Sequence, residues 1–174
     1  MLSKAVMVSH TKPEARTIFL LIFIGCASLV SYALYLQLVK NLLPCPLCVV
    51  QRIAYWSVGL TALLAFIHSP GVIGRRIYSG LLACFAVAGA VVALRHAWLV
   101  RYPEAFECGV SPEEEFLNAL PLAQWWPGMF EANGDCADVT WQFASLTLPD
   151  WSAIFFMLFG GLAIHALLAV RNRR

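Results

Sequence analysis

Long runs of apolar residues, separated by short polar segments, dominate the pattern along this chain. A helix needs about 20 apolar residues to cross a bilayer core of roughly 30 Å, and four runs reach or nearly reach that length. They cover about residues 17–39, 45–67, 77–98 and 151–170. We therefore predict an all-α membrane protein, one integral membrane domain over residues 1–174 built as a bundle of four transmembrane helices.

The polar segments give two loops on one side of the membrane, a short one at about residues 40–44 and a long one at about residues 99–150. Within the long loop, residues 120–130 are rich in Trp and large apolar side chains but are too short and too interrupted by Pro to span. We expect a short interfacial helix there, lying on the outer leaflet, with a merely packed loop as the alternative.

Composition supports a membrane protein, because 60% of the 174 residues are hydrophobic and only 13% are charged. The mean hydropathy of +0.73 is far above that of an ordinary soluble domain. A formal net charge of +2 is modest, and no basic patch alternates with aromatic residues. Nucleic-acid binding is therefore not expected.

The positions of the basic residues predict the orientation of the helices. They flank the first run on its N-terminal side, fill the turn between the second and third runs, and follow the fourth: Lys4, Lys12, Arg16, Arg75, Arg76, Arg171, Arg173 and Arg174. By the positive-inside rule these flanks are cytoplasmic, so both termini lie inside and both loops outside. We interpret the first run as a retained anchor rather than a cleaved signal.

This orientation divides the six cysteines into two kinds. Cys26 and Cys84 fall in the middle of spans, where a free Cys behaves as a small buried hydrophobe. The other four map to the outer side, the compartment in which disulfides form and persist: Cys45, Cys48, Cys108 and Cys136. Any thiol chemistry is expected among these four.

Cys45 and Cys48 form a C-x-x-C motif at the entry of the second span. Free N–H groups and the positive end of the helix dipole favour a thiolate there, and Pro46 suits the first helical turn because it gives up an N–H that has no partner. We expect a lowered thiol pKa and a redox pair. The alternatives are a structural disulfide or half of a zinc site.

We expect Cys108 and Cys136 to pair with each other, either as a structural staple or as a transferable disulfide. Gly109, Asn133 and Gly134 beside them favour mobility and hence exchange. A zinc site made with Cys45 and Cys48 is the metal alternative. Against it, the long loop carries no second C-x-x-C and no His near these cysteines.

Arg52 follows Cys48 by one helical turn, so both lie on one face of the second span. A charge inside a membrane is costly and marks a functional candidate, here a group that would bind a quinone carbonyl as it gains negative charge. Snorkelling to the headgroups is the alternative.

His96 lies near the outer end of the third span. We take His96 rather than Arg95 as the candidate hydrogen-bond donor to the same ring, and the alternative is an interfacial His whose hydrogen bonds are made within the protein.

Taken together, these residues resemble the disulfide bond formation protein B (DsbB) family. The resemblance covers nearly the whole chain: the four spans, the Cys45-Pro46-Leu47-Cys48 entry with Arg52 behind it, the His96 to Pro103 stretch leading to Cys108, and Asn133-Gly134-Asp135-Cys136 followed by Trp141.

The resemblance implies an enzyme of the bacterial inner membrane, a thiol:quinone oxidoreductase. A periplasmic DsbA-like thiol oxidase would attack the Cys108 to Cys136 disulfide at Cys108, Cys136 would exchange with Cys45, and Cys48 would pass electrons to the quinone. Arg52 and, less directly, His96 match quinone-binding residues. Either ubiquinone or menaquinone fits, and no metal is needed.

Two other functions remain open from the sequence. A relative of vitamin K epoxide reductase would also exchange electrons with a quinone-like ring, but its ring-facing C-x-x-C is expected in a late span rather than at the second. A metal-binding or disulfide-stapled membrane protein without enzymatic activity is the other alternative.

Overall fold

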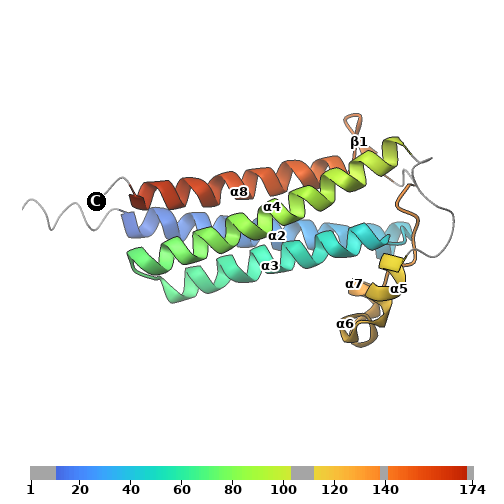
Figure 1. Ribbon diagram of the computed structural model, residues 1–174, viewed down its shortest axis with the longest axis horizontal. Coiled ribbons are helices and arrows are strands. Elements are labelled where there is room, and N and C mark those ends of the chain that lie inside the picture. The colour runs from blue at the N-terminus through green and yellow to red at the C-terminus, as the bar shows by residue number, and fades with distance from the viewer. Residues whose placement is uncertain (1–10, 103–111, 138–140, 172–174) are drawn as a thin grey trace, which may run out of the picture.

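The computed structural model describes residues 11–102, 112–137 and 141–171, and four long helices run side by side through most of its length (Figure 1). They are α2 (Thr11–Lys40), α3 (Pro46–His68), α4 (Val72–Arg101) and α8 (Leu148–Arg171). Each is long and apolar enough to cross a membrane. The predicted bundle of four transmembrane helices is confirmed, with α4 extending past residues 77–98 at both ends.

The turn between α3 and α4 follows ordinary rules for ending and starting helices. Ser69 takes a left-handed conformation with φ of 44°, and its N–H donates to the Ala65 carbonyl at 3.2 Å. Pro70 cannot extend the helix, and Gly71 precedes the first residue of α4. The two helices therefore run antiparallel as close neighbours.

Small residues allow the helices to approach closely, as is usual in membrane bundles. A Cβ atom added to Gly89 on α4 would lie 2.4 Å from the ring of Phe156 on α8. That ring stacks on Tyr55 of α3, with centroids 4.1 Å apart. The Tyr55 hydroxyl in turn hydrogen-bonds to the Ser152 hydroxyl at 3.0 Å, so one set of contacts joins three of the helices.

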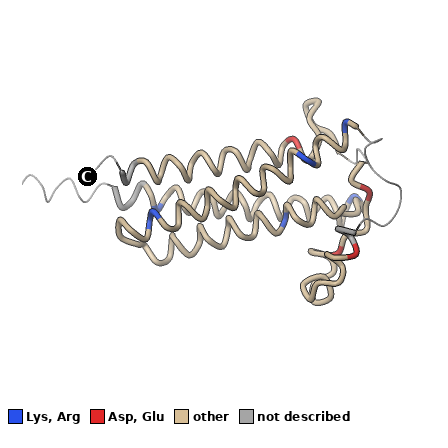
Figure 2. The backbone as a smooth tube through the Cα atoms, in the orientation of Figure 1, with Lys and Arg blue, Asp and Glu red and all other residues tan. Residues whose placement is uncertain are grey.

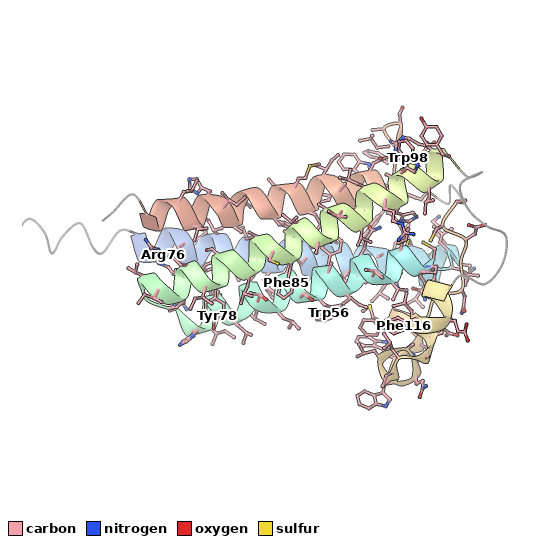
Figure 3. All side chains as sticks on the ribbon, viewed as in Figure 1. Trp56, Arg76, Tyr78, Phe85, Trp98 and Phe116 are labelled. Atoms are coloured by element: carbon pink, nitrogen blue, oxygen red, sulfur yellow. The ribbon has the colours of Figure 1, made fainter. Side chains whose placement is uncertain are left out.

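The two ends of the bundle differ in the residues they carry. Figure 3 shows Arg76 and Tyr78 at the end formed by the α3–α4 turn, and Trp98 and Phe116 at the opposite end. The acidic residues drawn in Figure 2 gather at that opposite end, which also carries the short helices. Between the ends the outward-facing side chains are largely apolar, as lipid contact requires.

Three short helices, α5 (Pro112–Ala119), α6 (Pro121–Trp125) and α7 (Pro127–Phe130), lie beside α3 at this end (Figure 1). Helices α6 and α7 confirm that the Trp-rich segment is helical. Pro127 divides this segment into two helices, because proline has no N–H to continue the hydrogen bonds. The Trp125 side chain is 83% exposed. The predicted position on the outer leaflet stays a prediction.

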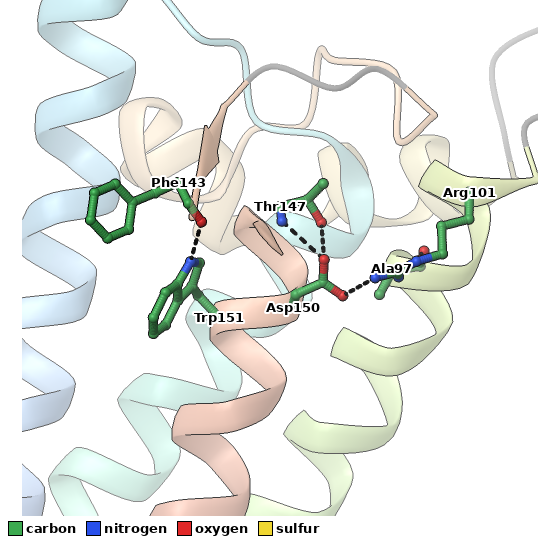
Figure 4. Close-up of polar contacts among 6 residues, drawn as sticks. All are labelled: Ala97, Arg101, Phe143, Thr147, Asp150 and Trp151. Atoms are coloured by element: carbon green, nitrogen blue, oxygen red, sulfur yellow. Dashed lines mark hydrogen bonds and ion pairs between the residues drawn. The ribbon is translucent and has the colours of Figure 1, made fainter. Parts of the chain in front are cut away.

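A small hairpin, β1 (Gln142–Phe143) and β2 (Leu146–Thr147), leads into α8. Asp150 fixes this junction, since one carboxylate oxygen accepts from the N–H and hydroxyl of Thr147 at 2.9 and 2.7 Å. Its other oxygen pairs with Arg101 of α4 at 2.8 Å (Figure 4). Trp151 donates to the Phe143 carbonyl at 3.2 Å. The hairpin is thereby held against the end of the bundle.

Candidate functional site

Cys45 is the N-cap residue of α3, and Pro46 is the first residue of that helix. The Cys45 sulfur accepts a hydrogen bond from the Cys48 N–H at 3.4 Å, as a Ser or Asp oxygen does in an ordinary cap. Cys45 is only 3% exposed. The C-x-x-C motif therefore stands at the helix entry that the sequence predicts, with its first sulfur buried.

The segment of residues 132–136 lies across the chain that precedes Cys45. The N–H groups of Asn133 and Gly134 both donate to the Pro44 carbonyl, at 3.0 and 3.1 Å. A Cβ at Gly134 would lie 2.5 Å from the Leu43 carbonyl oxygen, so only Gly fits this approach. The sequence suggested mobility for Asn133 and Gly134, whereas in the structure they dock this segment.

A second anchor holds the same segment to α5. The side-chain amide of Asn118 donates to the Ala132 carbonyl and accepts from the Ala132 N–H, both at 2.9 Å. This pair of hydrogen bonds resembles the pair that two residues exchange in an antiparallel β-sheet. It fixes the path of the chain shortly before Cys136.

Docking of this segment brings Cys136 against Cys45, and both are buried in one small cluster with Leu47 and Leu99. The Cys45 thiol hydrogen-bonds to Cys136, which raises the pKa of Cys45 and lowers that of Cys136. Burial and the Cys48 sulfur raise the Cys45 pKa further. The lowered pKa predicted for the helix entry is therefore wrong for Cys45, because a neighbouring sulfur outweighs the helix dipole.

His96 approaches the same sulfurs from α4. Its Nε2 lies 3.6 Å from the Cys45 sulfur and its Nδ1 lies 4.0 Å from the Cys48 sulfur. The Gln51 amide hydrogen-bonds to Nδ1 at 3.1 Å. With Cys45 and Cys48, His96 lines a small recess, while Arg95 lies on the exposed face of α4.

Beside this cluster is a cavity of about 380 Å³ between α2, α3, α8 and the hairpin. Its walls are mostly apolar and aromatic, including Leu29, Val30, Tyr32, Leu36, Trp141, Phe143, Trp151 and Phe155. Such a volume falls in the range of about 300–1,000 Å³ typical of small-molecule sites. Its position reflects the bundle, in which α2 packs along α3 and α8 along α4 while α2 and α8 contact each other much less.

The polar groups of the cavity form one stripe on α3. Cys48, Gln51, Arg52 and Tyr55 all line it, at the spacing that places residues on one face of a helix. His96 is not among the lining residues of this cavity. The sequence thus predicts correctly that Cys48 and Arg52 share a face. His96 instead contacts the Cys45 and Cys48 sulfurs from outside the lining of this cavity.

Arg52 is 6% exposed, and its contacts are inside the protein. Its Nη1 donates to the Gln37 side-chain oxygen at 2.8 Å and to the Met129 carbonyl at 3.2 Å. These partners come from α2 and α7, so the guanidinium is held by hydrogen bonds inside the protein. Sequence reasoning missed Gln37, although an uncharged amide within a span is itself a signal of a polar partner.

The remaining cysteines are separate from this cluster. Cys26 is buried in the core of the bundle, as expected, whereas the expectation of a buried residue is wrong for Cys84, which is exposed on the outer surface. Cys108 lies outside the described residues, so its predicted pairing with Cys136 stays a prediction. Within the described residues, the sulfurs that come together are those of Cys45, Cys48 and Cys136.

The fold and this cluster define a class: a multi-pass membrane protein with a cluster of cysteine sulfurs at one end of a four-helix bundle. A family model described as "Disulfide bond formation protein DsbB" matches residues 15–166. The chain belongs to this family.

Curated relatives named "Disulfide bond formation protein B" agree with the family assignment. One from Nitrosospira multiformis is 71% identical over 96% of this chain and 99% of its own length. One from Nitrosomonas europaea is 70% identical over 85% of this chain and 90% of its own. A more distant one from Aromatoleum aromaticum is 41% identical over 92% and 95%.

Proposed function

We propose that this protein is a thiol:quinone oxidoreductase that reoxidises a periplasmic DsbA-like thiol oxidase and passes the electrons to a membrane quinone. One observation carries the proposal. The sulfur of Cys48 and the guanidinium of Arg52 line the same apolar cavity, while the partner sulfur, Cys45, contacts Cys136 from the outer loop. A route for electrons from the loop to the cavity therefore runs through adjacent sulfurs.

The residues of the cavity suit a quinone head group. Aromatic and aliphatic walls would contact the ring, and the sparse contact between α2 and α8 would let it enter from the lipid. Both hydrogen bonds of Arg52 within the described residues use Nη1, which leaves Nη2 as a donor for a carbonyl oxygen. When bound, a quinone accepts two electrons and two protons.

The exchange begins at the outer loop. A thiolate of the reduced partner attacks Cys108 of the Cys108–Cys136 disulfide, which releases Cys136 as a thiolate. The second thiol of the partner then displaces Cys108, and the partner leaves with a disulfide. Its two electrons now reside on the thiols of Cys108 and Cys136.

The second exchange delivers these electrons to the cavity. The Cys136 thiolate attacks Cys45 of the Cys45–Cys48 disulfide and releases Cys48 as a thiolate on the cavity wall. Cys108 then attacks Cys136, which restores the outer disulfide and frees Cys45. The Cys45 and Cys48 thiols give up two electrons and two protons as their own disulfide reforms. Arg52 stabilises the negative charge that develops in the cavity.

This chemistry implies a location and an orientation. The partner and the disulfides belong to the oxidising periplasm, so we propose the bacterial inner membrane with both termini in the cytoplasm and the cysteine cluster on the periplasmic side. Arg76, near the start of α4, lies at the opposite end of the bundle (Figure 3), which supports this orientation.

The test is quinone reduction by purified protein in detergent, with a reduced thioredoxin-like oxidase as electron donor and a short-chain ubiquinone or menaquinone as acceptor. We expect the parent chain to reduce quinone, Cys45→Ser and Cys48→Ser to abolish it, and Cys26→Ser and Cys84→Ser to retain it. Full activity in Cys45→Ser or Cys48→Ser would contradict the proposal.

A further inference from the structure

Three potential metal ligands meet at the helix entry. Cys45, Cys48 and His96 each offer one ligand atom, and these atoms all lie within 4.8 Å of one another. Cys45 and His96 are buried, and Cys48 is partly buried. The sequence could not reveal this set, because His96 comes from α4 and lies about fifty positions from the C-x-x-C motif.

We propose that this cluster binds one zinc ion when its cysteines are reduced, with Cys45, Cys48 and His96 as ligands and Cys136 completing the tetrahedron. Cys136 suits the fourth position because its sulfur hydrogen-bonds to Cys45 and is buried in the same cluster. Three thiols release their protons to water and no electron moves. The inference rests on this geometry and stands whether or not the protein reduces quinone.

The distances among Cys45, Cys48 and His96 fit zinc with little adjustment, whereas Cys136 lies outside this 4.8 Å group and its sulfur has to move closer to coordinate. In a tetrahedral site with Zn–S near 2.3 Å and Zn–N near 2.0 Å, neighbouring ligand atoms lie roughly 3.5–3.8 Å apart. The Cys45 sulfur is 3.6 Å from His96 Nε2, which is already at that spacing. Nε2 is therefore the coordinating nitrogen, and the Cys48 sulfur has to move by at most about one ångström.

Gln51 supplies the outer contact that metal-binding histidines usually have. Its side-chain amide lies 3.1 Å from His96 Nδ1. The amide nitrogen faces Nδ1 in the structure, so zinc binding requires the amide to flip. Its carbonyl oxygen then accepts the Nδ1 proton and leaves the Nε2 lone pair for the metal. Three thiolates around Zn²⁺ leave one net negative charge, and Arg52, whose charge acts on both Cys45 and Cys48, offsets it.

The site exists only in the reduced protein. A disulfide between Cys45 and Cys48 removes two of the thiolates, so the oxidised protein lacks the ligands that soft and borderline metals prefer. Zinc therefore competes with disulfide formation for the same sulfurs. A bound ion holds the protein in its reduced state and removes the electron route proposed above.

Zinc binding is tested on the full chain in detergent, without an oligohistidine tag. The protein is reduced with a phosphine, because a thiol reductant would itself bind zinc. After addition of zinc and gel filtration, metal content is measured by mass spectrometry. We expect one zinc per chain in the reduced protein and none after oxidation. Equal zinc in the two states would overturn the proposal, and the same polypeptide serves as its own control for folding.

The ligands are assigned by competition with a chromophoric chelator. Cys45→Ser, Cys48→Ser, Cys136→Ser and His96→Gln should each weaken zinc binding by at least about tenfold. Cys84→Ser and His165→Gln, matched changes on the outer surface, should bind as the parent does. Unchanged affinity in Cys136→Ser would overturn its role as fourth ligand.

Cobalt(II) gives a readout of geometry that is independent of activity. In the parent chain we expect the absorption bands of tetrahedral cobalt with thiolate ligands, and in His96→Gln a shift of those bands. A spectrum typical of octahedral cobalt in the reduced parent would overturn the site. Quinone reduction takes no part in these measurements, so failure of the electron-transfer proposal and failure of the zinc proposal are distinguishable.

Discussion

At the scale of single residues, Cys45 has contacts that determine where protons reside in the cluster. Its sulfur accepts the Cys48 N–H, donates toward Cys136 and lies 3.6 Å from His96 Nε2. Because Cys136 is the largest influence on it, Cys45 keeps its proton and Cys136 is favoured as the thiolate. This preference belongs to the reduced protein, because Cys45 has no thiol proton to donate once it is in the Cys45–Cys48 disulfide.

Removing this neighbour should change the titration of Cys45. In the reduced protein the hydrogen bond to Cys136 raises the Cys45 pKa, so Cys136→Ala should lower it and let Cys45 form a thiolate at lower pH. The measurement is the rate of iodoacetamide modification of Cys45 against pH, read by peptide mass spectrometry. Cys84→Ser is the control, and a midpoint that stays in place or rises in Cys136→Ala would contradict this assignment.

Arg52 should act on the quinone and not on the thiol partner. Loss of a charged hydrogen bond costs roughly 1.5–3 kcal/mol, so Arg52→Ala should raise the KM for quinone by about tenfold to a hundredfold. Disulfide exchange with the soluble partner, followed in single turnover without quinone, should change much less. Arg95→Ala, on the exposed face of α4, is the comparison. Equal quinone kinetics in Arg52→Ala and the parent chain would remove Arg52 from the quinone site.

At the scale of elements, the junction between α3 and the docked segment 132–136 organises the cluster. The helix entry follows from local sequence, since a Cys N-cap and Pro46 are adjacent in the chain. The docking of segment 132–136 does not follow from local sequence, because Asn133 and Gly134 donate to the Pro44 carbonyl, almost ninety positions earlier in the chain. Turn-forming residues indicate where a chain can bend but do not indicate what it will bend against.

Gly134→Ala tests the docking directly. The new Cβ would lie 2.5 Å from the Leu43 carbonyl oxygen, so the segment has to shift and Cys136 moves away from Cys45. We expect slower exchange between the outer and inner disulfides and a stability loss of about 1–3 kcal/mol, measured by stopped-flow quenching and by thermal unfolding.

Asn133→Ala is the matched control, because the contact of Asn133 with Pro44 uses its backbone N–H and survives the change. It should leave both the exchange rate and the unfolding midpoint close to those of the parent chain. If Gly134→Ala behaves in the same way, the docked segment does not control the approach of Cys136.

At the scale of the whole molecule, hydropathy alone predicts the four spans, because a bilayer requires uninterrupted apolar helices. It does not predict the cavity, which depends on which helices pack together. The weak contact between α2 and α8 opens the space, and Gln37 from α2 reaches Arg52 only because α2 packs along α3. The apolar pattern of each helix is compatible with several arrangements of the bundle.

Orientation is the whole-molecule property on which the proposed function depends. The positive-inside rule places the α3–α4 turn in the cytoplasm and the segment after α4 in the periplasm. Alkaline phosphatase needs disulfides and is active only in an oxidising compartment. A fusion after Tyr102 should therefore be active and a fusion after Gly71 inactive. The reverse result would place the cysteine cluster in a reducing compartment, where its disulfides would not persist and no periplasmic partner could reach Cys108.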